Sequence, residues 1–294
     1  MRRITRTLLP AVGFALAGTA AHAQYNVYGI TTGNGGAQQL VRFNSANPMR
    51  VTTLGLTGAS LTGLDFRPAT GMLYGYNGSQ LFTVNLRTGA ATQVATVSSP
   101  TGANVGFDFN PTVDRIRIVD AAGANRRVNP VDGVAIQDGA YAYAPGDVST
   151  GAPAFSAVAY TNSDTDPATG TTLYGVDGGL GNLVEITAPN GGLVNTVGSL
   201  GFGFSPTIAG FDILTVGGMN LAYLSAVDGN ASRFYRVNLE TGAASLVGNV
   251  RVAGGLQGIA VGTAVVPEPS TWALMATGLA GLVVGARRRR AAAK

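Results

Sequence analysis

A pattern that recurs five times along the chain restricts its fold more than any other feature. The clearest copies are VNLRTGAATQVATV at residues 84–97 and VNLETGAASLVGNV at residues 237–250. Each predicts a strand, a Thr-Gly turn and a second strand. Looser copies begin at Val41, Val128 and Ile186, so successive copies start 43, 44, 58 and 51 residues apart. A pattern of this length and period indicates a repeat architecture.

Two more short apolar segments accompany each copy. The first is a Val-Tyr-Gly-like segment that begins at Val27, Leu73, Ile116, Leu173 and Ala222. The second resembles Gly-Leu-Asp-Phe and begins at Gly63, Gly106, Ala157, Gly210 and Gly258. Each repeat therefore holds four short strands, which is the unit of a β-propeller blade.

We therefore predict an all-β chain in which residues 24–263 form one five-bladed β-propeller. In a blade, the Gly-Leu-Asp-Phe-like segment is expected to be the inner strand, next to the axis. The first repeat lacks such a segment, and the last copy, at 258–261, stands alone at the end of the repeats. This strand can complete the first blade and close the ring, which removes exposed sheet edges. Six blades are the alternative if residues 134–157 contribute strands of their own. Almost no helix is expected, because no segment has a sustained 3.6-residue apolar period.

Residues 1–23 have the features of a secretory signal peptide. Three arginines near the start precede an apolar run from Leu8 to Ala20, and Ala21-His22-Ala23 follows as a small-residue cleavage site. This order of charge, apolar core and A-x-A motif is typical of export leaders. We expect cleavage by signal peptidase before Gln24.

The C-terminal segment 264–294 contains three ordered elements. These are Pro267-Glu268-Pro269, an apolar stretch at 271–286 that includes Trp272, and the basic run Arg287, Arg288, Arg289 and Arg290. Fifteen apolar residues from Trp272 span roughly 22 Å, which is short of the ~30 Å hydrocarbon core. The span can extend to Thr271 with Trp272 at the interface, and the arginines favour the cytoplasmic side. This tail resembles the PEP-CTERM sorting signal. The resemblance implies a Gram-negative bacterium that makes an extracellular polysaccharide matrix. It also implies an exosortase that removes the tail after transient inner-membrane anchoring; a permanent anchor is the alternative.

The formal net charge of +4 belongs to the two ends. Between residues 24 and 266, 11 Arg face 14 acidic residues, and there is no His, Lys or Cys. The basic composition therefore does not indicate nucleic-acid binding. The missing residues exclude a Ser-His-Asp triad, a Schiff-base lysine and a zinc–thiolate site from this region. An enzyme would have to use carboxylates, and a hard cation such as calcium is the only metal cofactor left open.

The central region also resembles a family of secreted bacterial propellers called domain of unknown function 4394. The resemblance rests on GFDFNPTVDRIRIVD at 106–120, NRRVNP at 125–130 and NSDTDPATGTTLYGVD at 162–177. It implies a propeller fold and export with a sorting tail. It implies no activity.

Three groups of residues are candidate sites. Asp65, Asp108 and Asp212 occupy one position of the inner strand, where they either bind a hard cation near the axis or accept backbone hydrogen bonds from a neighbouring blade. The second option is favoured, because structural needs recur with each blade. Asn162, Asp164 and Asp166 have the spacing of a calcium loop, but Pro167 follows and an Asx turn explains them equally well.

The third group is the basic cluster Arg115, Arg117, Arg126 and Arg127. It could hold an anion such as a uronic acid or a phosphate. The preferred explanation is a polar strand face paired with Asp114 and Asp120. Nearby, Tyr141, Tyr143 and Tyr160 could stack on sugars.

These features favour an exported, non-catalytic propeller at the cell surface or in the extracellular matrix that binds glycan or protein. The alternative is a carboxylate-dependent polysaccharide hydrolase or lyase, assisted by calcium. The partners expected are the secretion machinery, signal peptidase, an exosortase, and polysaccharide or matrix proteins.

Overall fold

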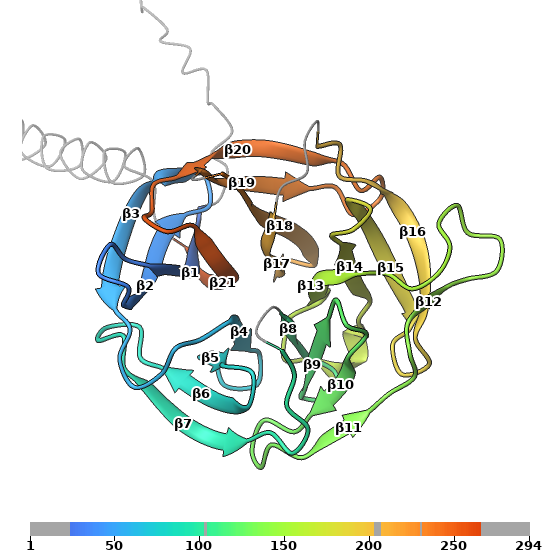
Figure 1. The fold of residues 1–294 in the computed structure, drawn as a ribbon, viewed down its shortest axis with the longest axis horizontal. Helices are drawn as coiled ribbons and strands as arrows, with labels where there is room; N and C mark the ends of the chain where they lie inside the picture. Colours follow the sequence, from blue (N-terminus) through green and yellow to red (C-terminus); the bar gives the residue numbers. More distant parts are fainter. Residues whose placement is uncertain (1–23, 103–104, 203–206, 230, 266–294) are drawn as a thin grey trace, which may run out of the picture. The chain divides into compact units, whose positions relative to one another are not determined.

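Five small β-sheets surround a common axis in a computed structural model of the chain (Figure 1). The structure describes residues 24–102, 105–202, 207–229 and 231–265. Residues 24–266 cluster as one compact unit. The predicted signal peptide and the predicted membrane span at 271–286 lie outside the described residues. Among those described, no helix is long and apolar enough to cross a membrane.

Each sheet is one blade, and its strands are given from the axis outward. Blade 1 contains β21 (Leu256–Val265), β1 (Tyr25–Thr32), β2 (Gln38–Asn44) and β3 (Asn47–Gly55). Blade 2 contains β4 (Gly63–Arg67), β5 (Met72–Tyr76), β6 (Gln80–Val84) and β7 (Ala91–Thr96). Blade 3 contains β8 (Val105–Asn110), β9 (Arg115–Asp120), β10 (Asn125–Val128) and β11 (Ala135–Gln137).

Blade 4 has five strands, and blade 5 has four like the first three. Blade 4 contains β13 (Phe155–Tyr160), β14 (Leu173–Asp177), β15 (Asn182–Ala188), β16 (Leu193–Ser199) and the short β12 (Ala142–Tyr143). Blade 5 contains β17 (Thr207–Val216), β18 (Met219–Asp228), β19 (Ala231–Val237) and β20 (Ala244–Val250). One 3₁₀ turn, η1 (Pro167–Thr169), is the only helical element of the described residues.

The ring closes as the sequence predicts. The last strand, β21, pairs antiparallel with β1, and Ala260 lies opposite Tyr28. Blade 1 is therefore built from both ends of the domain, so that every inner strand is paired within its blade. The inner strands β4, β8, β13, β17 and β21 contact their neighbours around the axis (Figure 1).

The region 134–157 does not form a sixth blade, so the count is five. Within it, β11 becomes the outer strand of blade 3. The next strand, β12, pairs in parallel with β16 as an additional outermost strand of blade 4. Both short strands are absorbed by existing sheets, because each covers an edge that would otherwise expose unpaired backbone groups.

The hydrophobic core consists of five layers, one between each pair of adjacent blades. The layer between blades 2 and 3, for example, packs Tyr76 of β5 against Phe107 of β8, with ring centroids 6.0 Å apart. Because strand side chains alternate between two faces, each blade buries apolar residues against both neighbours. The sheets are therefore hydrophobic on both sides.

The glycines of three repeated hairpin turns, Gly89, Gly133 and Gly242, lie close against the backbone of the preceding blade at the outer rim. Gly89 has a φ of +72°, and a Cβ atom there would lie 2.2 Å from the carbonyl oxygen of Gly55 in blade 1. A Cβ atom at Gly133 or Gly242 would likewise lie too close to the carbonyl oxygen of Thr96 or Gly198, respectively. The repeated glycine is therefore required both by the backbone conformation and by the approach of the preceding blade.

Candidate functional site

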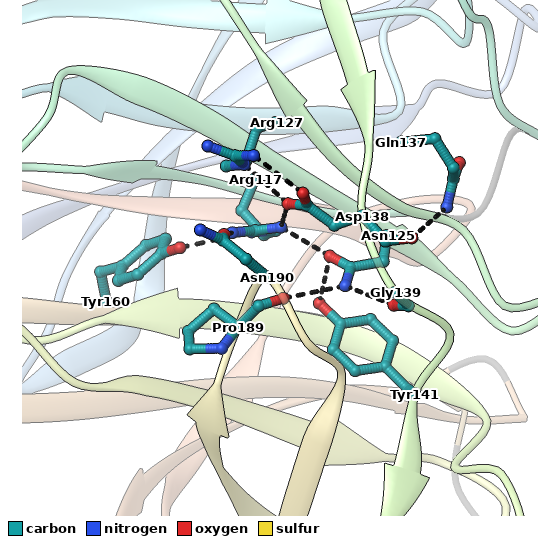
Figure 2. A network of polar contacts seen from close by, with 10 residues as sticks. All are labelled: Arg117, Asn125, Arg127, Gln137, Asp138, Gly139, Tyr141, Tyr160, Pro189 and Asn190. Carbon is teal, nitrogen blue, oxygen red and sulfur yellow. Dashed lines mark hydrogen bonds and ion pairs between the residues drawn. The ribbon is translucent and has the colours of Figure 1, made fainter.

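Arg117 is the centre of a polar network between blades 3 and 4 (Figure 2). It lies on β9, and its side chain is only 2% exposed. Its Nη1 donates to Asp138 Oδ2 and to Asn125 Oδ1, each at 2.6 Å. Its Nε donates to the hydroxyl of Tyr160 at 3.3 Å and its Nη2 to Asn190 Oδ1 at 2.8 Å. A buried guanidinium is tolerated here because a carboxylate and neutral acceptors surround it.

Electrostatics keep Arg117 charged. Burial alone would lower its pKa, but Tyr160, Tyr141 and Asp138 raise it above the ordinary value. Asp138 also accepts a bidentate pair from Arg127, through Nε at 2.7 Å and Nη2 at 2.9 Å. Asp138 carries one negative charge, and Arg117 and Arg127 carry two positive charges. The three side chains together therefore keep a net positive charge.

A cavity of about 540 Å³ lies over this network. We call it the Arg pocket. Its polar lining includes Arg115, Arg117, Arg127, Tyr160 and Asn190. Pro189, Val113 and Ala188 supply apolar wall, whereas the side chain of Ile116 is fully buried in the layer between blades 2 and 3. No carboxylate is among the described residues that line it.

The structure divides the predicted basic cluster. Arg115, Arg117 and Arg127 line the Arg pocket, but Arg126 does not. Arg126 pairs with Ile118 and Arg127 with Arg117 across β9 and β10, so the two adjacent arginines project from opposite faces of the sheet. The Nε and Nη1 atoms of Arg126 are buried and have no hydrogen-bond partner among the described residues.

Asp114 and Asp120, the carboxylates predicted to pair with this cluster, have other partners in the structure. Asp114 forms an ion pair with Arg67 of blade 2, with Nη2 and Oδ2 2.5 Å apart. Asp120 accepts hydrogen bonds from the backbone of its own turn, at Ala122 and Ala124. The pairing prediction was therefore wrong: Asp138, far along the chain in a connection, is the counterion.

Asp65, Asp108 and Asp212 meet at the axis of the ring. One carboxylate oxygen of each aspartate lies within 4.8 Å of those of the other two. Each also accepts a backbone hydrogen bond from the inner strand of the next blade: Asp65 from Phe109 at 2.7 Å, Asp108 from Tyr160 at 2.9 Å and Asp212 from Val261 at 2.5 Å. Each aspartate therefore links two blades. Blades 4 and 1 have Ala159 and Ala260 at this position and lack the link.

Burial shifts the titration of these aspartates. It raises the pKa of Asp212 to about 6. Burial, and next the charge of Asp212, raise the pKa of Asp65 well above its usual range. Burial, and next the charges of Asp65 and Asp212, do the same for Asp108. Three close carboxylates need either protons or a cation, and the oxygens would suit a hard cation such as calcium.

A second cavity, of about 470 Å³, opens over Asp65 and Asp212 at one end of the axis. Ser163, Asp164 and Thr165 of the 162–166 loop lie at its edge. Within that loop, the carboxylates serve local turns. Asp164 Oδ1 accepts from the backbone of Asp166 at 2.9 Å, and Asp166 caps η1 by accepting from Ala168 at 2.9 Å. Asn162 binds Asn220 of blade 5 instead, through side-chain contacts.

The tyrosines near the basic cluster are mostly core residues. Tyr141 and Tyr143 are buried in the layer between blades 3 and 4, where they are not available to stack on a sugar. Tyr160 is also buried, but it lines the Arg pocket. Asn125, Asp138 and Asn190 were not anticipated from the sequence. They lie in or next to connections, where no periodic pattern identifies them.

Comparison with known proteins identifies two segments of the chain. The profile of the family described as "Domain of unknown function (DUF4394)" matches residues 39–260. The profile described as "PEP-CTERM protein-sorting motif" matches residues 265–290. No curated protein matches the sequence.

Three solved structures are similar in part. An auxiliary nutrient binding protein from Bacteroides ovatus has 15% identity and a TM-score of 0.41, with 66% of this chain and 55% of that chain covered. TolB from Acinetobacter baumannii has 9% identity and a TM-score of 0.43, with 81% and 66% covered. An auxiliary nutrient binding protein from Bacteroides thetaiotaomicron has 14% identity and a TM-score of 0.40, with 76% and 59% covered. The chain thus spans between 55% and 66% of the length of these proteins.

Proposed function

This chain belongs to the DUF4394 family, and we propose that it is a non-catalytic propeller that binds glycan or protein at the cell surface or in the extracellular matrix. Its PEP-CTERM motif implies export and processing by an exosortase-type sorting system, with transient anchoring at the membrane. The binding role and the final location are the proposal.

The observation that carries the proposal is the Arg pocket. A cavity of about 540 Å³ has the size of a small-ligand site. Its arginines and Tyr160 are donors on the strands β9, β10 and β13, and its apolar wall adds contact area. Such a combination of a few fixed polar groups with apolar surface is typical of binding sites.

The hydrogen bonds that the three carboxylates at the ring axis accept from the backbone also support a non-catalytic binding role. An acid-base glycosidase needs two carboxyl groups that are free to reach the substrate. Asp65, Asp108 and Asp212 each hold the backbone of the next blade, so a structural role accounts for all three. Repetition at three blade junctions fits this role as well.

The purified protein should be incubated with a panel of acidic and neutral polysaccharides, while binding and new reducing ends are measured together. We expect retention of at least one polysaccharide without new reducing ends. Cleavage that is abolished by D65N or D212N would replace the proposal with a carboxylate-dependent hydrolase or lyase.

A further inference from the structure

We infer that the Arg pocket binds a sugar unit that carries a carboxylate, as in the uronic acid residues of an acidic polysaccharide. This inference rests on the proposed binding function and specifies the chemistry of its ligand.

The charge of the pocket selects an anion. Three guanidinium groups line it, and Asp138 beneath it supplies a single negative charge. Arg115 is exposed at the start of β9, and its described contact is to the backbone oxygen of Asp114 at 3.0 Å. The pocket therefore keeps an excess of positive charge that no described residue neutralises.

The donors suit two coplanar oxygens. Arg127 uses Nε and one Nη2 hydrogen for Asp138, which leaves both hydrogens of Nη1 and one of Nη2 without contacts among the described residues. These lie along the outer edge of the guanidinium, where a carboxylate can accept two parallel hydrogen bonds. The pairing with Asp138 holds this edge in one orientation (Figure 2).

Further donors suit hydroxyl groups. The Tyr160 hydroxyl accepts from Arg117, so its own hydrogen remains to donate. Asn190 accepts through Oδ1, so its Nδ2 group remains available as well. Donors at separate points favour a ligand with several oxygens over a bare ion.

The size and the wall of the pocket favour a sugar ring. A volume of about 540 Å³ is far larger than a single inorganic anion requires. Pro189 and Val113 offer apolar surface on which the C–H face of a pyranose can pack. A ring with hydroxyl groups and one carboxylate uses all three properties of the site.

Calorimetric titration of the purified protein with trigalacturonate, neutral galactotriose, galactose 6-phosphate and inorganic phosphate tests the inference. We expect trigalacturonate to bind at least about tenfold more tightly than the other three, as a charge-assisted contact predicts. R115A and R127A should each weaken its binding about tenfold or more. R87A removes the same charge from an exposed turn and should leave binding unchanged.

Arg127→Lys adds a readout that a general charge effect would not produce. It keeps the charge but loses the two-nitrogen edge, so binding of trigalacturonate should stay weakened. Circular dichroism melting of each variant checks that the fold is intact. Because Asp138 keeps Arg117 as a partner, loss of Arg127 leaves no unpaired buried carboxylate.

Three results would overturn the inference while leaving the proposed function in place. These are equal binding of galactotriose, binding of a phosphate compound as tight as that of trigalacturonate, and tight binding that R115A and R127A do not weaken. Cleavage of trigalacturonate would instead contradict the proposed non-catalytic function.

Discussion

The carboxylate of Asp212 in β17 accepts a hydrogen bond at 2.5 Å from the backbone N–H of Val261 in β21. The bond joins blade 5 to the strand that closes the ring. It therefore links residues 49 positions apart and holds the closing strand against blade 5. Asp65 and Asp108 make the same bond at two other junctions, so ring closure and the axial acid cluster are parts of one arrangement.

This arrangement predicts that stability falls as the pH rises. The pKa of Asp212 is raised to about 6 in the folded protein, whereas an unfolded Asp titrates near about 3.9. A proton therefore binds the folded state more tightly. The stability it contributes is fully present below about pH 4 and is lost as the pH rises through about 6.

Urea unfolding of wild type and D212N between pH 4.5 and pH 8 measures this effect. The wild type should lose about 2 kcal/mol of stability over this range through Asp212, because part of the full effect of about 3 kcal/mol lies below pH 4.5. D212N should lose less, since asparagine keeps an acceptor for Val261 but does not ionise. D132N, at an exposed turn, is the control. A rise in stability with added calcium at pH 8 that D212N removes would identify a cation in place of protons.

Loss of the Asp138 carboxylate should strongly destabilise the protein. D138A leaves the guanidinium of Arg117, 2% exposed, without its counterion. Breaking a buried ion pair from one side costs about 3–5 kcal/mol. D228A removes the counterpart of Arg233 from a half-exposed pair and should cost less than about 1 kcal/mol. Equal losses in chemical unfolding of both variants would contradict the importance given to the buried network.

The turn glycines allow the contact between blades to be separated from backbone strain. Gly89 and Gly71 have φ values of +72° and +66°, but only at Gly89 would a Cβ atom meet a neighbouring carbonyl. G71A should cost about 1 kcal/mol through strain alone. G89A should cost at least about 1 kcal/mol more, because the outer rim of blades 1 and 2 must separate. Thermal melts that rank the two variants equally would show that the contact relaxes freely.

Removal of the Pro-Glu-Pro motif should block processing of the tail. Replacement of Pro267, Glu268 and Pro269 by alanine removes the signal that the sorting motif supplies, so the full-length chain should remain with the membrane fraction. Mass spectrometry of the exported wild-type protein should find no peptide through Arg290. An intact tail on exported material would contradict exosortase processing.

The repeats made the architecture predictable because each blade reuses the same short-range rules. Recurring short apolar segments identified the strands, and the Thr-Gly turns identified the hairpins. The unpaired inner strand at 258–261 then required a partner in the first repeat, and β21 indeed pairs with β1. The number of blades needed the structure, because the short strands β11 and β12 joined existing sheets.

The contacts of the arginine cluster could be predicted only in part from the sequence. The two-residue period of a strand implies that Arg126 and Arg127 face opposite sides of the sheet, so only one of them can share a pocket with Arg117. The counterion Asp138 is a different matter. It lies in a connection between blades, 21 residues from Arg117, and nothing in its neighbourhood distinguishes it from Asp114 or Asp120.

The sequence by itself determined the all-β repeat architecture, the closing strand, the sorting tail and the absence of His, Lys and Cys from the central region. These properties depend on residue type and on short-range periodicity. Only the tertiary structure decided that three repeated aspartates meet at the axis and that Arg115, Arg117 and Arg127 share a pocket with Tyr160 and Asn190. The physical reason is that ring closure brings together side chains from different blades, and their separations depend on how the blades pack.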